Sequence, residues 1–232
     1  MEREPRGDTN PDEHDVPVDE DVIALMEQLS RTTIGRQFRL AGGTALALQL
    51  GHRRSNDLDY FMHGDRIDAT AIMCVVDSLT PTIGRAEIVL AESGQLDLVV
   101  GGARRKVSFI AYPFAPRHEP LEIHGQQCSR VIEVAAMKAY AIGRRAAARD
   151  YVDVEASLSF GGLGLGEIVE EARNRFVVDD EPVFSERLFL QQLVDTSDLT
   201  DAAGLALIRS SWPDVERSLR HAVATYVRSR LP

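Results

Sequence analysis

Residues 41–61 read AGGTALALQLGHRRSNDLDYF, and this stretch decides the predicted fold. The glycine pair Gly42-Gly43 precedes a short apolar run that suits a helix, and a polar loop then leads to a strand predicted at 57–62. Glycines ahead of a helix leave backbone N–H groups open to an anion, because no Cβ blocks the approach and the helix dipole is positive there. The stretch predicts an α/β fold with an anion-binding turn beside a strand.

The predicted strand carries two aspartates, Asp57 and Asp59. Side chains alternate along a strand, so both carboxylates are expected to leave the same face. Mg²⁺ prefers carboxylate and phosphate oxygens, and it bridges a nucleoside triphosphate to the protein while neutralising charge on the leaving pyrophosphate. Asp57 and Asp59 are therefore predicted to be catalytic and to bind Mg²⁺ as the cofactor.

Polar side chains near this pair extend the predicted site. Thr44 offers a hydroxyl at the start of the helix, and Ser55 faces the same site as Asp57 if the strand extends back to it. Arg53 would do likewise at the rim. Taken singly these signals are weak, because a glycine pair is usually a turn and an Asp-x-Asp is commonly a solvated strand end. Their order predicts nucleotide binding by Gly42, Gly43, Thr44, Arg53 and Ser55.

A helix predicted at 131–146 contains IEVAAMKAYAI, in which Lys138 is the only charge within the central turns. A buried ammonium needs an anion, so Lys138 is predicted to bind the nucleotide, with a structural ion pair as the alternative. The helix expected at 150–159 holds two further aspartates. Asp150 suits a helix cap, and Asp153 is compatible with pairing to Arg149 one turn away. Asp153 is the one predicted to be functional.

These segments resemble the AbiEii family of nucleotidyltransferase toxins, which includes the MenT toxins of type IV toxin–antitoxin systems. The resemblance rests on GGT, GHR-x-S-x-DLDYF, VSFIAYPF, the residues around Lys138 and RDYVD at 149–153, and it covers about residues 36 to 160. It implies a metal-dependent enzyme that transfers a nucleotide from a nucleoside triphosphate to RNA, specifically to a tRNA 3′ end, and thereby stops translation. It also implies a cognate antitoxin.

The resemblance assigns Lys138 to the nucleotide phosphates. It gives Asp153 a catalytic acidic role, either as base toward the acceptor hydroxyl or as support for Lys138, and the sequence does not separate the two. One departure concerns the third metal-site aspartate that many nucleotidyltransferases carry on a neighbouring strand, because this chain has Ser108 there. Asp97 on QLDLVV is left out of the catalytic set, since its spacing differs and a surface strand aspartate is the commoner explanation.

Three alternative functions stay open. The first is a nucleotidyltransferase of the same fold that modifies a small molecule such as an antibiotic. The second is a non-catalytic nucleotide-binding regulator, which the missing third carboxylate favours. The third is an interaction protein that retains only the scaffold. Fold by itself does not distinguish them.

The order of the segments predicts three parts. Residues 1–18 are expected to form a flexible acidic arm outside the core. Residues 19–125 are predicted to form a nucleotidyltransferase-like lobe with a mixed sheet and flanking helices, and residues 126–232 a mostly helical lobe. The glycine-rich segment 161–166 follows a helix and lacks the lysine of a P-loop, so it is predicted to be a turn.

The formal net charge is −10, but residues 1–21 contain nine acids and two arginines and so contribute −7. Residues 37–160 hold 14 acids and 14 basic residues. Basic clusters at 53–54, 104–106 and 144–149 suit either RNA phosphates or a solvated surface. The chain has no apolar run of roughly 20 residues and no apolar secretion signal, so a cytoplasmic protein without membrane contact is expected.

Overall fold

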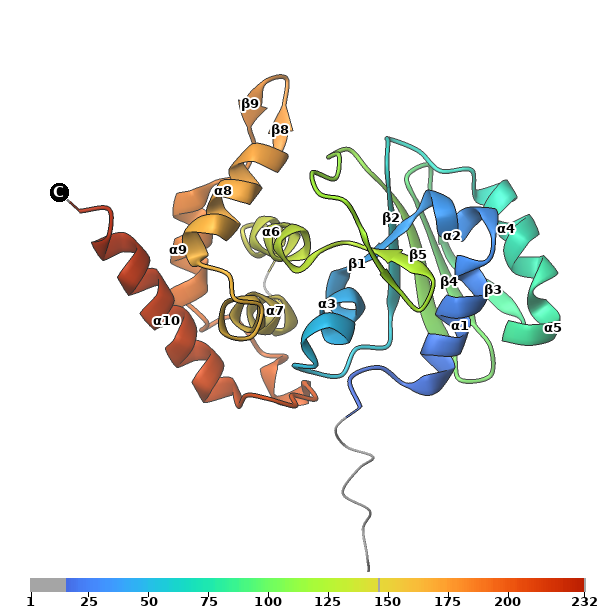
Figure 1. The fold of residues 1–232 in the computed structure, drawn as a ribbon, viewed down its shortest axis with the longest axis horizontal. Coiled ribbons are helices and arrows are strands. Elements are labelled where there is room, and N and C mark those ends of the chain that lie inside the picture. Colours follow the sequence, from blue (N-terminus) through green and yellow to red (C-terminus); the bar gives the residue numbers. More distant parts are fainter. Residues whose placement is uncertain (1–15, 146, 232) are drawn as a thin grey trace, which may run out of the picture.

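The computed structural model describes residues 16–145 and 147–231, which form two lobes (Figure 1). The first lobe is built on a seven-stranded mixed sheet in the order β3-β4-β5-β2-β1-β7-β6, and the second is helical apart from a short hairpin. The predicted fold class is confirmed. The sheet strands are β1 (Arg39–Ala41), β2 (Leu58–His63), β3 (Ala86–Ala91), β4 (Gln95–Val100), β5 (Arg105–Tyr112), β6 (Leu121–Ile123) and β7 (Gln126–Cys128).

Helices flank this sheet and build the second lobe. None of the helices in the described part of the chain is long and apolar enough to cross a bilayer. The helices of the first lobe are α1 (Glu20–Ser30), α2 (Thr33–Gln37), α3 (Gly42–Leu50), α4 (Ala69–Ser78) and α5 (Thr80–Ile83). In the second they are α6 (Val131–Ile142), α7 (Ala148–Ser159), α8 (Leu165–Arg175), α9 (Glu186–Val194) and α10 (Trp212–Arg228), with a 3₁₀ turn at Ala202–Gly204.

Two local predictions need correction. The apolar spacing after residue 18 predicts one helix at about 19–34, but the structure has two, because the Thr32 hydroxyl accepts a hydrogen bond from the Gly35 N–H and starts α2 anew. After the glycine-rich turn at 161–166 the sequence predicts only helices, whereas β8 (Val177–Val178) pairs with β9 (Glu181–Pro182). Asp179 and Asp180 turn this hairpin with φ angles of 50° and 64°, a conformation that aspartate tolerates better than most residues.

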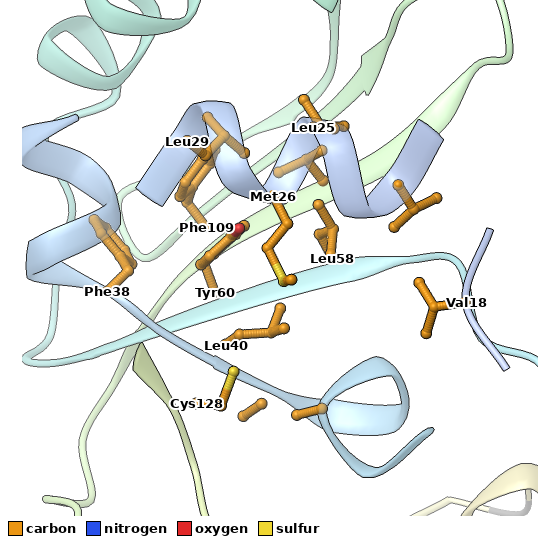
Figure 2. Packing of buried hydrophobic residues seen from close by; sticks show 14 of the residues in the cluster. Val18, Leu25, Met26, Leu29, Phe38, Leu40, Leu58, Tyr60, Phe109 and Cys128 are labelled. Atoms are coloured by element: carbon orange, nitrogen blue, oxygen red, sulfur yellow. The ribbon is translucent and has the colours of Figure 1, made fainter. Parts of the chain in front are cut away.

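The central strands separate a core face from a site face. Leu58, Tyr60 and Phe109 point toward α1, where Tyr60 and Phe109 stack with their ring centroids 5.4 Å apart (Figure 2). Because side chains alternate along β2, Asp59 leaves the opposite face. Asp59 lies opposite Ser108 on β5, and Ser108 lies opposite Asp97 on β4, so these three residues share that face.

Most of the predicted acidic arm, residues 1–15, lies outside the described residues. Its last residues do not match the prediction, because Val18 is 1% exposed and belongs to the core of the first lobe. The Pro17 carbonyl accepts the Ser55 N–H at 2.9 Å, and Asp19 exchanges two hydrogen bonds of 3.0 Å with Asn56. The end of the predicted arm thus holds the loop that leads into β2.

Candidate active site

A cavity of about 670 Å³ lies between the site face of the sheet and helix α6. This volume falls within the range of small-molecule sites, roughly 300 to 1,000 Å³. Segments far apart in the sequence meet around it, as the resemblance leads one to expect. The predicted residues in its lining are Gly42, Gly43, Arg53, Ser55, Asp57, Asp59 and Lys138.

Asp57 and Asp59 both line the cavity, although Asp57 lies just before β2 and not within it. Asp57 is exposed and Asp59 is half-buried. Burial raises the pKa of Asp59, Lys138 opposes this shift, and the neighbouring Asp57 adds to it. Among residues 16–145 and 147–231, neither carboxylate has an ion-pair partner. Two unpaired carboxylates of this kind suit a hard divalent cation.

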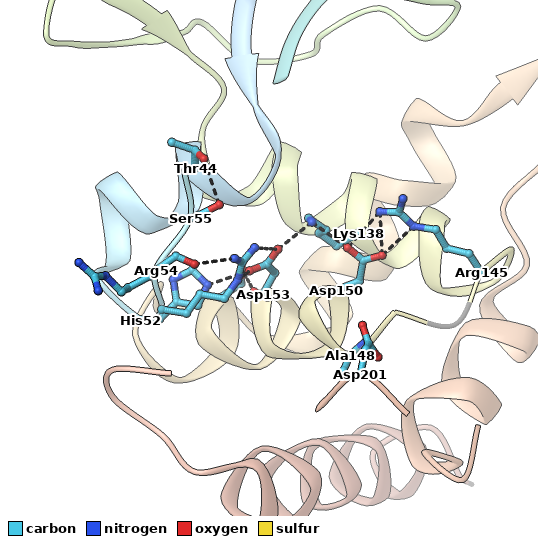
Figure 3. Close-up of polar contacts among 12 residues, drawn as sticks. Thr44, His52, Arg54, Ser55, Lys138, Arg145, Ala148, Asp150, Asp153 and Asp201 are labelled. Carbon is cyan, nitrogen blue, oxygen red and sulfur yellow. Dashed lines mark hydrogen bonds and ion pairs between the residues drawn. The ribbon is translucent and has the colours of Figure 1, made fainter. Parts of the chain in front are cut away.

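Lys138 is buried and forms ion pairs with two aspartates of α7. Its Nζ lies 2.7 Å from Asp150 Oδ1 and 2.7 Å from Asp153 Oδ2 (Figure 3). The Lys138 side chain also lines the cavity, so the helix brings a fixed positive charge to the wall. Burying this ammonium is tolerable because two fully buried carboxylates accompany it.

Asp153 binds three groups at once. Arg53 donates from Nε to Oδ1 at 2.7 Å and from Nη2 to Oδ2 at 3.0 Å, and His52 Nε2 lies 2.8 Å from Oδ1. Burial alone would raise the pKa of Asp153, but Lys138, Arg53 and the His52 hydrogen bond hold it well below its usual range. Asp153 has no exposed surface, and both of its oxygens bind cations, so it is placed to hold Lys138 and Arg53 in position.

Asp150 is the second acid of the network, and its predicted role as a helix cap is wrong. Helix α7 begins two residues earlier, and Asp150 instead binds Lys138 and accepts 2.9 and 3.2 Å hydrogen bonds from Arg145. The alternative considered for Asp153, a pairing with Arg149, is not found among the described residues, where Asp153 binds Lys138, Arg53 and His52. The i,i+3 spacing of the two aspartates was a sequence signal that both share one helix face.

The glycine pair makes room for protein side chains. At Gly42, where φ is +69°, a Cβ would lie 2.7 Å from Asp59 Oδ2. At Gly43 a Cβ would lie 2.1 Å from Arg53 Nη2 and 2.9 Å from Ser55 Oγ. Any larger residue would therefore displace the carboxylate or the guanidinium from the cavity wall, in addition to obstructing a ligand.

Thr44 lies behind the cavity and not in its wall. It is fully buried, its hydroxyl donates to the Asp57 carbonyl, and its Oγ1 lies 3.0 Å from Ser55 Oγ (Figure 3). The predicted nucleotide contact is thus replaced by a structural one that holds the loop before β2. Ser55 remains in the cavity lining.

The helical lobe braces the loop that carries Arg53. The Arg54 N–H donates to the Ala206 carbonyl at 2.9 Å, and the Ile208 N–H donates to the His52 carbonyl at 2.9 Å. The Asp201 carboxylate accepts the Ala148 N–H at 3.0 Å and so satisfies the first turn of α7. Contacts from both lobes therefore fix the positions of Asp153 and its partners.

Asp97 is not the surface residue that its sequence context suggests. It is 7% exposed, accepts a hydrogen bond from Gln95 Nε2 at 2.9 Å, and lies 3.5 Å from Lys106 Nζ. It does not line the cavity, whereas Gln95, Lys106 and Ser108 do. The described residues contain no cluster of three or more histidine, cysteine, aspartate or glutamate side chains able to hold a metal.

Some residues of the basic clusters line the cavity, and others bind acids outside it. Arg105 binds Asp19 and Asp21, each at 2.8 Å, while Arg104 lies 3.3 Å from Glu87. Arg144 lies over the Tyr140 ring at 3.5 Å and lines the cavity. Cations therefore surround Asp57 and Asp59 on the cavity side, and they are Arg53, Arg54, Lys106, Lys138, Arg144, Arg145 and Arg149.

Known proteins resemble the chain over most of its length. The model of a family described as nucleotidyl transferase AbiEii toxin, type IV TA system, matches residues 24–225. The chain is 25% identical over 205 residues to the uncharacterized protein aq_aa25 of Aquifex aeolicus (strain VF5), which covers 88% of this chain and 95% of that protein.

Solved structures share its fold. JHP933 from Helicobacter pylori has a TM-score of 0.61 at 18% identity and covers 91% of this chain and 94% of its own. MenT4, the nucleotidyltransferase toxin Rv2826c from Mycobacterium tuberculosis H37Rv, has a TM-score of 0.60 at 19% identity, with 91% and 82% covered. Both likenesses show the fold of the chain over most of its length.

Proposed function

The chain belongs to the AbiEii family of nucleotidyltransferase toxins of type IV toxin–antitoxin systems, and we propose that it transfers a nucleoside monophosphate from a triphosphate to the 3′ end of a tRNA. The observation that carries the proposal is the pair of unpaired carboxylates, Asp57 and Asp59, in a cavity whose other charged lining residues are all cations. A triphosphate needs both the metal that carboxylates hold and direct positive charge. A tRNA with a blocked 3′ end cannot be aminoacylated, so translation would stop.

The two aspartates fit Mg²⁺ by the chemistry of their donors. Neither carboxylate has an ion-pair partner among the described residues, and the partial burial of Asp59 favours a counter-ion for its charge. When bound, Mg²⁺ would neutralise charge on the phosphates and on the leaving pyrophosphate. With only Asp57 and Asp59 from the protein, its remaining ligands would be water and phosphate oxygens.

The cationic wall would orient the triphosphate. Lys138 has three N–H donors and two carboxylate partners, which leaves one donor for a phosphate oxygen. Arg149 is exposed in the cavity and near enough to Asp59 to lower its pKa. In the transfer, the acceptor oxygen bonds to the α-phosphorus as the bond to pyrophosphate breaks, and the protein contributes positioning and charge.

The cations on the rim of the cavity would contact the tRNA acceptor. Arg144, Arg145 and Arg149 follow α6 and are exposed, which suits a phosphate backbone. The paired Arg104 and Arg105 are not assigned to RNA. Because the proposed substrates are triphosphates and tRNA, the reaction would take place in the cytoplasm. A cognate antitoxin would be the protein partner of this chain.

The test is incubation of the protein with total tRNA, Mg²⁺ and each labelled ribonucleoside triphosphate in turn. Asp57→Asn and Asp59→Asn should abolish labelling while the fold survives, because each removes an anionic metal ligand. Asp77→Asn, an exposed change on α4, is the matched control and should label like the wild type. A folded Asp59→Asn protein with full activity would exclude the metal site. Absence of label with every triphosphate would favour a small-molecule acceptor or a non-catalytic regulator.

A further inference from the structure

A second cavity, of about 300 Å³, continues the first along the same face of the sheet. Phe61, Tyr112 and Met137 line both cavities and so form the wall between them. Phe61 and Tyr112 meet edge to face with their ring centroids 5.4 Å apart. Beyond this wall the polar lining consists of Gln37, Arg39, His63, Ser129 and Arg175.

The lining of the second cavity has two arginines and no carboxylate. Arg39 lies opposite Phe61 in the pairing of β1 with β2, so its side chain leaves the site face. Its Nη1 donates to the His118 carbonyl at 2.8 Å, which fixes the guanidinium without neutralising it. Among the residues that the structure describes, no carboxylate lies within ion-pair distance of Arg39.

Arg175, at the end of α8, is 8% exposed and incompletely bonded. Its Nε is buried without a hydrogen-bond partner, and its Nη1 lies 3.4 Å from the Glu133 carbonyl and 3.8 Å from the Glu133 carboxylate. That carboxylate accepts the Arg117 N–H at the shorter distance of 2.9 Å. Burial lowers the pKa of Arg175, and Glu133 opposes this shift. Arg175 and Arg39 line the same cavity.

Two cations that line one cavity are costly to bury when no acid lines it, unless an anion joins them. We propose that the second cavity binds a phosphate group between Arg39 and Arg175. Guanidinium groups present planar pairs of N–H donors that match phosphate oxygens, and Gln37 and Ser129 add neutral polar groups. The phosphate belongs either to a free anion or to an RNA strand that passes the aromatic wall, and both share the same chemistry.

The test follows the ring signal of His63 in protein labelled with ¹⁵N-histidine, because His63 lines the second cavity and not the first. Inorganic phosphate is titrated at constant ionic strength, and a short oligoribonucleotide is titrated in parallel. The assignment of the signal is checked with His63→Gln. We expect saturable shifts, and Arg39→Gln should weaken binding at least ten-fold.

Two controls separate this cavity from its neighbours. Arg36→Gln removes an exposed arginine of α2 outside the cavity and should leave the affinity unchanged. Lys138→Ala disables the first cavity and should also leave the His63 shift intact. Shifts with inorganic phosphate would identify a free anion as sufficient, and shifts with the oligoribonucleotide alone would assign the phosphate to RNA. No shift with either probe, or an unchanged affinity in folded Arg39→Gln protein, would overturn the proposal. The readout is binding, so it is independent of whether tRNA is labelled.

Discussion

Replacing Asp153 with asparagine tests whether this residue supports two cations or acts on the substrate. The change leaves Lys138 and Arg53 buried with less compensation, and removing one partner of a buried ion pair costs about 3–5 kcal/mol. Lys138 keeps Asp150 at 2.7 Å, so a loss near the lower limit, about 3 kcal/mol, is expected. That is a large part of the 5–15 kcal/mol typical of a folded domain.

The assay is urea unfolding followed by circular dichroism, with Asp77→Asn as the exposed control that should stay within about 0.5 kcal/mol of the wild type. Transfer activity is measured on Asp153→Asn protein at a temperature where it is fully folded. A stability loss below about 1 kcal/mol together with complete loss of transfer would refute the reasoning. Asp153 would then act on the substrate and not through Lys138 and Arg53.

Other changes test the cavity wall and its charges. Gly43→Ala should destabilise the protein by about 1–3 kcal/mol in urea unfolding, because the new Cβ would lie 2.1 Å from Arg53 Nη2. Gly102→Ala, where a Cβ meets nothing within 4 Å, should stay within about 0.5 kcal/mol of the wild type. Lys138→Ala should raise KM for the triphosphate in steady-state transfer assays more than KM for tRNA; equal effects would contradict its assignment to the nucleotide. Because the folded pKa of Asp153 is depressed, its stabilisation should persist above the unfolded value of about 3.9 and be lost as pH falls through the folded value, as urea unfolding at a series of pH values would show.

The local sequence was sufficient for the fold class and for the positions of most elements. Apolar residues alternate along β2, β4 and β5 and form a stripe on α1. These patterns indicate which side chains are buried, because the opposite arrangement would expose apolar surface to water. The same patterns placed Asp57 and Asp59 near one face before the structure did. They did not reveal the break between α1 and α2, because a hydrogen bond within one turn decides it.

The polar network around Asp153 could not be predicted from local sequence patterns. Arg53 and His52 bind Asp153 across 100 and 101 residues of chain, and no periodicity relates such positions. The sequence left Asp153 with two roles, and only the structure shows that cations contact both of its oxygens. Val18 likewise carries no local sign that it enters the core.

The sequence by itself determined the α/β class, the strand that carries Asp59 and the helix that carries Lys138, because these depend on side-chain periodicity and local chemistry. Only the tertiary structure decided that Thr44 supports a loop, that Arg149 faces the cavity, and that Arg39 and Arg175 line a second cavity beyond an aromatic wall. The physical reason is that electrostatic cost depends on distance and burial in three dimensions. Those quantities arise only when segments distant in the chain pack together.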